Sequence, residues 1–262
     1  MSDPRTLRIA DYHYELPEER IAKHPPADRG QSRLLVRRDG SISDSCFTEL
    51  STHLPAESVI VLNNTRVVKA RLFFTKESGA RIEILCLDPA DQGPMEQAMD
   101  RCGGAEWWCT VGNLKKWKGG RLNCTGGPPV RRIQVCAEAM ERRGGEVRVR
   151  FSWKPDALTF SEVLDTVGEV PLPPYMDRDA ETDDTERYQT VFAVREGSVA
   201  APTAGLHFTP DLFADLSKAG HERIELTLHV GAGTFKPVKS ERMEDHAMHS
   251  ERIEVPVTTV EA

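Results

Sequence analysis

The chain has 262 residues, of which 39% are hydrophobic and 29% are charged, and its formal net charge is −7 at pH 7. This composition is typical of a globular protein with one large or two ordinary domains, and it excludes collagen-like and low-complexity chains. The sequence has no apolar run of about 18 residues and no apolar signal core, so we expect a cytoplasmic protein with no membrane span. The acidic balance argues against a nonspecific nucleic-acid coat but allows a local basic patch.

The first sixty residues predict a short helix, a hairpin and a buried strand. Residues 16–21 place a proline and two acids where a helix N-terminus favours them, and Pro25 and Pro26 end that helix. Residues 32–37 predict a strand that turns at Asp39-Gly40. The nearly all-apolar run 58–62 predicts a strand buried on both faces.

From about residue 67 the pattern changes to short alternating segments separated by glycine pairs. The segments are 81–87, 107–111, 132–136 and 146–151, and the pairs are 103–104, 119–120, 126–127 and 144–145. Short strands punctuated in this way are typical of a small β-barrel or sandwich. We therefore expect an α+β protein: a mixed α/β main domain formed by residues 1–66 and 154–262, with a β-barrel-like domain inserted at 67–153.

After residue 153 the sequence predicts two helices, at 159–165 and 210–219, and two strands, at 188–194 and 223–230. Thr209 is the expected cap of the second helix, Pro210 takes its first position, and Gly220 follows its end. In the last strand the apolar residues share one face, which leaves Glu225, Thr227 and His229 on the other.

The segment 197–209 contains no charged residue and one histidine, His207. It is expected to form the loop between a strand and the capped helix, and such loops in mixed α/β folds often carry function. A lone histidine in a loop is more often a packed side chain than a catalytic one. The small neighbours and the helix that follows favour a site here.

Histidines and glycines near the end of the chain form a second candidate site. His246, His249 and Glu251, together with His229, offer metal ligands, but the same pattern fits a hydrogen-bonded or solvent-facing cluster. Gly231 and Gly233 follow the strand that carries His229, where they either admit a ligand to the backbone or make a tight turn.

Two arginines and the six cysteines allow more than one interpretation. Arg33 lies in an apolar strand and Arg66 follows one, so each either clamps a carboxylate or phosphate or forms a structural ion pair. The cysteines form no CxxC pair, so we expect reduced thiols. Cys102, Cys109 and Cys124 are the candidates for a metal site among them.

Several blocks of the sequence form an ordered set that spans nearly the whole chain. They are YxLPxxxIAxxP at 14–25 with Arg29, SRLL at 32–35, LNNTRVVKARL at 62–72, GEVPLPPY at 168–175, RYQTVFA at 187–193, SVAAPTAGLHFT at 198–209, LTLHVGAGTFKPV at 226–238 and HAMHSE at 246–251. In this order they resemble the S-adenosylmethionine:tRNA ribosyltransferase-isomerase family of queuosine biosynthesis. Residues 67–153 resemble the family in general character only.

This resemblance implies a reaction and its partners. The ribosyl group of S-adenosylmethionine is transferred and isomerised onto the aminomethyl group of a 7-deazaguanine at the tRNA wobble position, which gives epoxyqueuosine-tRNA, adenine and methionine. S-adenosylmethionine is a co-substrate, so no cofactor and no metal are implied. We expect a monomer that contacts no membrane and binds tRNA through local basic patches, with 67–153 as the candidate region. Family members continue beyond residue 262, so the resemblance also implies a missing C-terminal segment.

The reaction needs a base for the proton on the carbon beside the sulfonium, an acid or hydrogen-bond donor that helps adenine to leave, and a pocket that excludes water. We expect the catalytic residues to be His207, His229, His249 and Glu251. We expect the substrates to be bound by Arg33, Arg66, Tyr188, Gln189, Thr190, Ala201, Pro202, Thr203, Gly205, Gly231, Gly233 and Thr234.

Two other functions stay open from the sequence. A noncatalytic tRNA-binding remnant is one, and a reading frame that continues past residue 262 would argue against it. A metal-dependent hydrolase that uses His229, His246, His249 and Glu251 is the other, and a stoichiometric zinc or iron content would favour it.

Overall fold

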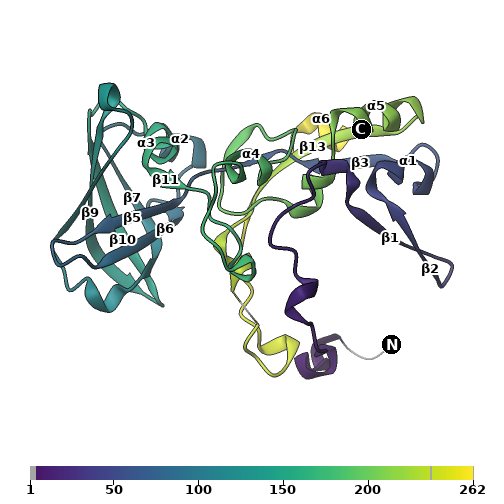
Figure 1. Ribbon diagram of the computed structural model, residues 1–262, viewed down its shortest axis with the longest axis horizontal. Helices are drawn as coiled ribbons and strands as arrows, with labels where there is room; N and C mark the ends of the chain where they lie inside the picture. Colours follow the sequence, from purple (N-terminus) through teal and green to yellow (C-terminus); the bar gives the residue numbers. More distant parts are fainter. Residues whose placement is uncertain (1–3, 237, 262) are drawn as a thin grey trace.

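The structure is a computed structural model that describes residues 4–236 and 238–261. It is a mixed α/β fold whose described residues form one seven-stranded sheet, one three-stranded sheet and two two-stranded sheets. Figure 1 shows the seven-stranded sheet rolled up at one end of the molecule and the smaller sheets at the other end. No helix among the described residues is long and apolar enough to cross a membrane.

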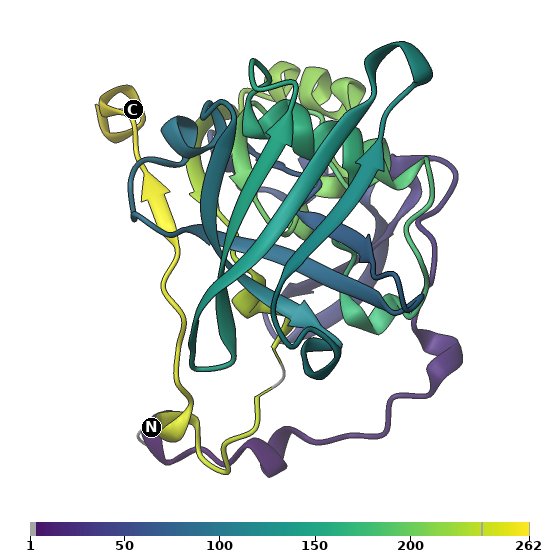
Figure 2. The same cartoon turned by 90° about the vertical axis from the view of Figure 1, so that its left-hand side faces the viewer.

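The seven-stranded sheet is antiparallel throughout and has the strand order β11-β5-β6-β7-β10-β9-β8. Its curl is clear in Figure 2. The strands are β5 (Arg71–Thr75), β6 (Arg81–Pro89), β7 (Gly104–Gly112), β8 (Arg121–Gly126), β9 (Ile133–Arg143), β10 (Glu146–Lys154) and β11 (Gly168–Glu169). The four strands predicted in this region are confirmed, and Gly144 and Gly145 turn the β9–β10 hairpin with positive φ angles. The edge strand β11 follows residue 154, so the sheet is not confined to the expected range 67–153.

The interior of this sheet is filled by large apolar side chains and is closed by a helix. Phe160 is fully buried, and its ring centroid lies 5.2–5.6 Å from the rings of Trp107, Phe151 and Trp153. The helix that carries Phe160 is held by a capping box, in which the Thr159 side chain accepts from the Glu162 backbone N–H and the Glu162 carboxylate accepts from the Thr159 N–H. The predicted helix at 159–165 is thereby confirmed.

The other end of the molecule is built from parallel pairs and a hairpin. The strands are β1 (Arg33–Arg38), β2 (Ser41–Cys46), β3 (Val59–Asn63), β4 (Thr65–Val67), β12 (Arg195–Ser198), β13 (Glu222–His229) and β14 (Arg252–Glu254). β13 pairs in parallel with β3 and antiparallel with β14, while β12 pairs in parallel with β4. The predicted hairpin of β1 and β2 and the predicted strand at 223–230 are confirmed.

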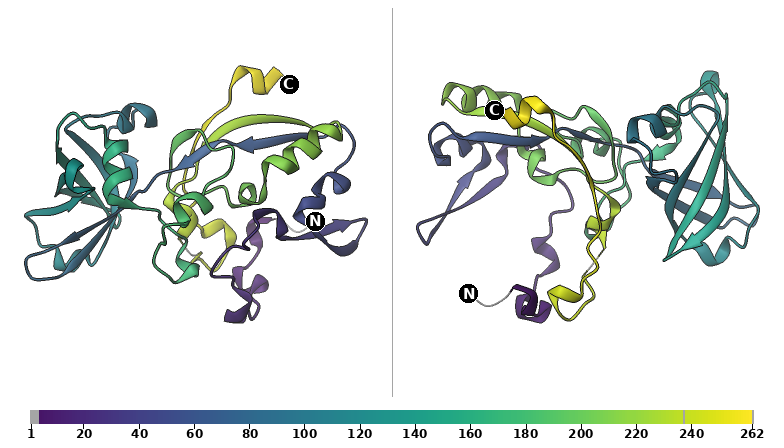
Figure 3. Two further views of the ribbon diagram at one scale, coloured as in Figure 1. Left: turned by 45° about the horizontal axis from the view of Figure 1, so that its top comes forward. Right: turned by 180° about the vertical axis from the view of Figure 1, so that it is seen from behind.

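The α-helices are short: α1 (Leu50–His53), α2 (Met95–Met99), α3 (Phe160–Val167), α4 (Asp184–Arg187), α5 (Pro210–Lys218) and α6 (Val257–Glu261). The Thr209 side chain accepts from the Leu212 N–H at the start of α5, and Gly220 follows its end with a φ of 83°, so this predicted helix is confirmed. α5 packs its apolar side on β3 through Leu212 and Leu62. Figure 3 shows the N-terminal segment beside the stretch at 241–245, where the Ile9 N–H donates to the Glu241 carbonyl at 3.0 Å.

Burial in the three-stranded sheet of β14, β13 and β3 differs from the prediction that residues 58–62 are buried on both faces. Leu62 is buried, but Val59 and Val61 on the opposite face of β3 are 44% and 55% exposed, so this strand is buried on one face only. On β13 the polar residues Thr227 and His229 are more deeply buried than the apolar face. The reason is that α5 and the β4–β12 pair cover one face of this sheet.

Two local predictions near the loops were wrong. The helix expected at 16–21 is a single 3-10 turn over Glu18–Arg20. Residues 188–194 are not a strand: α4 runs into a turn there, and β12 begins only at Arg195. Burial alternates along 188–192 as in a strand, but the Gln189 side-chain amide makes the contact, accepting from the Val67 N–H at 2.8 Å and donating to its carbonyl at 3.0 Å.

Truncation of the central aromatic side chain tests this description of the core. Because Phe160 is enclosed by three rings, Phe160→Ala is expected to lower the free energy of unfolding by about 3–5 kcal/mol. The measurement is denaturant unfolding followed by circular dichroism. Val130→Ala, at a side chain that is 96% exposed, is the control and should change stability by less than about 0.5 kcal/mol. Equal effects of the two changes would contradict the account.

Candidate functional site

The end of β12 and the loop that follows it line two cavities. Gly197, in β12, and Val199, at the start of the loop, line a cavity of about 530 Å³ that we call the His229 cavity. Thr203, Leu206 and His207, at the end of the loop, line a cavity of about 340 Å³ that we call the Tyr188 cavity. The uncharged segment 197–209 is thus shared between two sites.

The first half of this loop is fixed against the end of β13. The Ser198 hydroxyl accepts from the Val230 N–H at 2.8 Å and donates to the Ala200 carbonyl at 2.9 Å, and the Val199 N–H donates to the Val230 carbonyl at 2.9 Å. Gly197 has a φ of 137°, and a Cβ there would lie 2.3 Å from Met95 Cγ and 3.0 Å from the His229 ring. Glycine is needed at this position because its backbone conformation and these two side chains leave no room for a Cβ.

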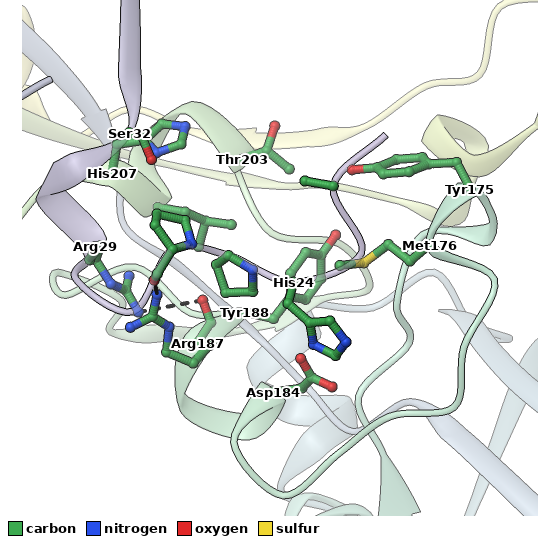
Figure 4. A pocket seen from close by; sticks show the side chains of 14 residues that line it. His24, Arg29, Ser32, Tyr175, Met176, Asp184, Arg187, Tyr188, Thr203 and His207 are labelled. Carbon is green, nitrogen blue, oxygen red and sulfur yellow. Dashed lines mark hydrogen bonds between the residues drawn. The ribbon is translucent and has the colours of Figure 1, made fainter. Parts of the chain in front are cut away.

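The Tyr188 cavity has largely apolar walls, contributed in part by the N-terminal segment (Figure 4). Pro25, Pro26 and Met176 are among these walls. The N-terminal segment is tied down by guanidinium groups: Arg29 Nη1 donates to the Gln189 carbonyl at 2.6 Å, and Arg187 Nη1 donates to the Ala27 carbonyl at 3.0 Å. Such a site suits a flat, weakly polar ligand.

Two titratable side chains in the Tyr188 cavity are uncharged at physiological pH. Burial raises the pKa of Tyr188 to about 12, so its hydroxyl keeps its proton. Burial, together with the nearby charge of Arg29, lowers the pKa of His207 below its ordinary value. The His207 ring centroid lies 5.1 Å from that of Phe47. Both side chains therefore offer hydrogen bonds without a net charge.

The His229 cavity lies between the seven-stranded sheet and the ends of β13 and β14. The sheet contributes Asp88, Trp108, Arg143 and Glu146, and the opposite side contributes His229, Gly231, Glu251 and Arg252. The Arg143 guanidinium lies 4.2 Å from the centre of the Trp108 ring, a cation–π contact. The cavity is therefore polar and carries charges of both signs.

The His229 ring is buried and held in one orientation. Its Nδ1 atom lies 2.9 Å from the Thr65 hydroxyl, which donates to the Arg195 carbonyl at 3.4 Å. With the Arg195 carbonyl as the acceptor for the Thr65 hydroxyl, we assign the tautomer in which Nδ1–H donates to Thr65 and Nε2 carries no proton. Burial is the largest cause that lowers the pKa of His229. Burial thus favours a neutral imidazole, whose Nε2 is free to accept a proton.

Glu251 and His249 interact with the two glycines after β13. Oε1 of Glu251 accepts from the Gly231 N–H at 3.0 Å and lies 3.3 Å from Nε2 of His249. A Cβ on Gly233 would lie 2.2 Å from the His249 ring, whereas one on Gly231 would meet nothing within 4 Å. Gly233 is required because His249 packs on the backbone.

The remaining predicted residues do not line either cavity. Arg33 is 82% exposed and pairs with Asp44 at 3.1 Å, while Arg66 faces Glu196 at 4.0 Å. A Cβ on Gly205 would meet the Phe192 ring at 3.0 Å, so this glycine serves packing. The others, which support the loop and its surroundings, are Gln189, Thr190, Ala201, Pro202, Gly233, Thr234 and His249.

Several residues of the two cavities were not among the predicted site residues. Asp88, Trp108, Arg143 and Glu146 come from residues 67–153, the region for which the sequence predicted a β-barrel-like domain and no catalytic or substrate-binding residue. Arg29 was part of a sequence block without an assigned role. Only the pairing of distant segments brings these side chains to a cavity.

The histidine cluster is not arranged as a metal site. Over residues 4–236 and 238–261, no three His, Cys, Asp or Glu side chains are placed to share a metal ion. His229, His246, His249 and Glu251 therefore do not form the ligand set that the hydrolase hypothesis requires, and Cys102, Cys109 and Cys124 form no such set either. The six cysteines are free thiols.

Known proteins match this chain over nearly all of its length. Residues 9–262 match the profile of the queuosine biosynthesis protein family. A protein from Chlorobium phaeovibrioides is 42% identical over 97% of this chain and 69% of its own length, and one from Syntrophomonas wolfei is 42% identical over 95% and 66%. Both are named S-adenosylmethionine:tRNA ribosyltransferase-isomerase, and the chain spans about two thirds of their length. The crystal structure of the S-adenosylmethionine tRNA ribosyltransferase from Thermotoga maritima is 26% identical over 95% of this chain and 62% of that one, with a TM-score of 0.34.

The two glycines after β13 allow a matched test of the His249 contact. Gly233→Ala should force the His249 ring away from its position beside Glu251, because the added Cβ overlaps the ring. Gly231→Ala should leave it in place. The measurement is the chemical shift of the His249 ring by NMR. A shift of equal size in both variants, or in neither, would contradict the described packing.

Proposed function

Because the chain belongs to the queuosine biosynthesis protein family, we propose that it transfers and isomerises the ribosyl group of S-adenosylmethionine onto 7-aminomethyl-7-deazaguanine at the tRNA wobble position. Epoxyqueuosine-tRNA, adenine and methionine are the products. The observation that carries the proposal is the placement of matched sequence blocks: the blocks at 198–209 and 226–238 together line both cavities. The first of them lines both cavities, with Val199 in one and Thr203, Leu206 and His207 in the other.

We assign the general base to His229. The reaction begins with removal of a proton from the carbon beside the sulfonium, and this requires an unprotonated base in a site with little water. His229 is 8% exposed, and its hydrogen bond to Thr65 leaves Nε2 as the accepting nitrogen. Thr65 is a positioning residue, since it fixes the tautomer of the ring.

The charges of the His229 cavity fit the amino-acid part of S-adenosylmethionine. Asp88, Glu146 and Glu251 favour its sulfonium and ammonium groups. Its carboxylate needs a guanidinium, and Arg143 is available for this because Arg252 already donates to the Gln92 and Gly93 carbonyls. The base and the charged groups therefore face the same ligand.

The Tyr188 cavity is assigned to the adenine end. A flat heterocycle suits its apolar walls, and the uncharged Tyr188 and His207 supply hydrogen bonds to ring nitrogens. His207 is then the group that assists departure of adenine. The loop at 199–207 contacts the nucleoside between the two cavities.

The remaining features of the proposal concern the whole protein. Residues 67–153, with most of the seven-stranded sheet, act as an inserted β-barrel-like domain on a main domain of residues 1–66 and 154–262. The protein is proposed to be a cytoplasmic monomer that needs no cofactor or metal. The alternative is a noncatalytic tRNA-binding remnant, which the detection of released adenine would exclude.

Adenine release is the direct test of the activity. The full-length protein, given S-adenosylmethionine and precursor-bearing tRNA, should release adenine, and His229→Asn should lower the rate by about 10²–10⁴-fold because the base is lost. The control is His13→Asn, at an exposed histidine that is distant in sequence from His229, and this variant should act like the wild type. A protein that binds tRNA without releasing adenine would support the remnant instead.

The pH dependence of the rate follows from the state of His229. A protonated imidazole cannot accept the substrate proton, so activity is lost as the pH falls through the folded-state pKa. Burial places that pKa below the ordinary value of 6.5. The rate of adenine release under tRNA saturation should therefore be level at neutral pH, with an acid limb whose midpoint lies below 6.5. A midpoint above the ordinary histidine value would rule out this assignment.

A further inference from the structure

Charge is divided unequally along this acidic chain. Residues 67–153 contain 15 lysines and arginines against 10 aspartates and glutamates, a net charge of +5. The rest of the chain contains 19 against 31, a net charge of −12. The excess of positive charge therefore coincides with the strands of the rolled sheet. A polyanion that approaches this protein meets attraction there and repulsion elsewhere.

Six of these cations come together at one end of the sheet, which we call the basic end. They are Lys76, Arg81, Lys115, Lys116, Lys118 and Arg142. Their contacts show that three separate segments meet: Lys76 Nζ donates to the Lys116 carbonyl at 2.8 Å, and Arg142 Nη2 donates to the Trp117 carbonyl at 3.3 Å. Trp117 is completely buried beneath this turn and anchors it.

The charges of the basic end are not neutralised by the protein. Among the described residues, none of its six cations forms an ion pair with a carboxylate. Arginines elsewhere on the same sheet differ, since Arg121 pairs with Glu138 at 3.0 Å and Arg150 with Glu106 at 2.8 Å. Of the acids nearby, Glu77 lies in the β5–β6 turn and Glu141 pairs with Arg148 at 3.4 Å. Cations without a carboxylate partner are free to bind phosphates. Each such contact favours binding because it releases counterions from the nucleic acid.

The basic end adjoins the His229 cavity. Arg142 and Arg143 are consecutive residues of β9, so their side chains leave opposite faces of the strand. Arg142 lies on the basic end, and Arg143 lines the cavity over Trp108. Figure 2 shows the β9–β10 turn and the short turn at 114–116 at the same end of the sheet. A strand of nucleic acid on the basic end can therefore place one nucleotide near the cavity.

We propose that the basic end binds the sugar-phosphate backbone of the tRNA and sets the position from which the modified base reaches the His229 cavity. The identity of the RNA rests on the proposed function. Among the described residues, one large apolar side chain near the basic end is exposed, that of Met140 on β9 at 41%. A single such side chain makes no apolar patch, which favours a polynucleotide over a lipid surface. Three segments with spaced cations match phosphates along a backbone.

The test compares two triple variants with the same net charge. Lys115, Lys116 and Lys118 are changed to Glu in one; the exposed Arg20, Arg37 and Lys218, which lie outside 67–153, are changed to Glu in the control. Fluorescence titration with tRNA should show at least 10-fold weaker binding for the first variant. The slope of log K against log salt should fall by about 2–3, since each lost phosphate contact contributes about 0.7–0.9. The control should bind like the wild type.

Two results would overturn the proposal: unchanged binding and salt slope in the Lys115/Lys116/Lys118 variant, or an equal loss in both variants. Circular dichroism checks that both variants fold, and Lys→Arg replacements at the three positions should restore binding. Adenine release separates this inference from the proposed function. In an active enzyme the basic-end variant should raise KM for tRNA with kcat within about twofold. If the wild type released no adenine while only the basic-end variant lost tRNA binding, the proposed activity would be refuted. The tRNA-binding role of the basic end would still be supported.

Discussion

The hydrogen bonds between Ser198 and Val230 determine how the rest of the site is arranged. They hold the loop after β12 against the end of β13, beside Gly197, where Met95 and the His229 ring leave no room for a Cβ. The same contact places His229 beside Thr65 on one side of the loop. On the other side it directs 203–207 toward the N-terminal segment. The contact between this loop and the end of β13 therefore lies next to residues of two cavities that differ in polarity.

This arrangement separates two chemical tasks. The His229 cavity collects charged groups from two sheets and keeps its imidazole neutral by burial. In the Tyr188 cavity the charged side chains Arg29, Asp184 and Arg187 are bonded to other protein groups, and burial keeps the Tyr188 hydroxyl protonated. A substrate with a charged amino acid at one end and a flat base at the other matches this division. The acidic protein meets its polyanionic partner through a separate basic surface, where local charge matters more than the net charge beyond a Debye length of about 8–10 Å.

The sequence predicted those elements whose signals are local. The capped helix α5, the capping box of α3 and the glycine turn of the β9–β10 hairpin depend on residues a few positions apart. The exposed face of β3 and the loop at 188–194 were mispredicted, because burial and pairing there depend on distant partners. His229 and Glu251 are predicted site residues that line a cavity, whereas Trp108 and Arg143 line the same cavity but were not predicted, because only the pairing of distant segments brings them there. Arg33 lies on an exposed hairpin, where it pairs with Asp44 away from both cavities, and its proposed contact with a substrate stays a prediction.

The central claim is that S-adenosylmethionine reacts in the His229 cavity. A crystal structure of the full-length protein with S-adenosylmethionine tests it most directly. The account predicts the carbon beside the sulfonium within reach of His229 Nε2, the carboxylate beside Arg143 and the adenine toward Tyr188. Binding of S-adenosylmethionine at a place that touches neither His229 nor Tyr188 would contradict it.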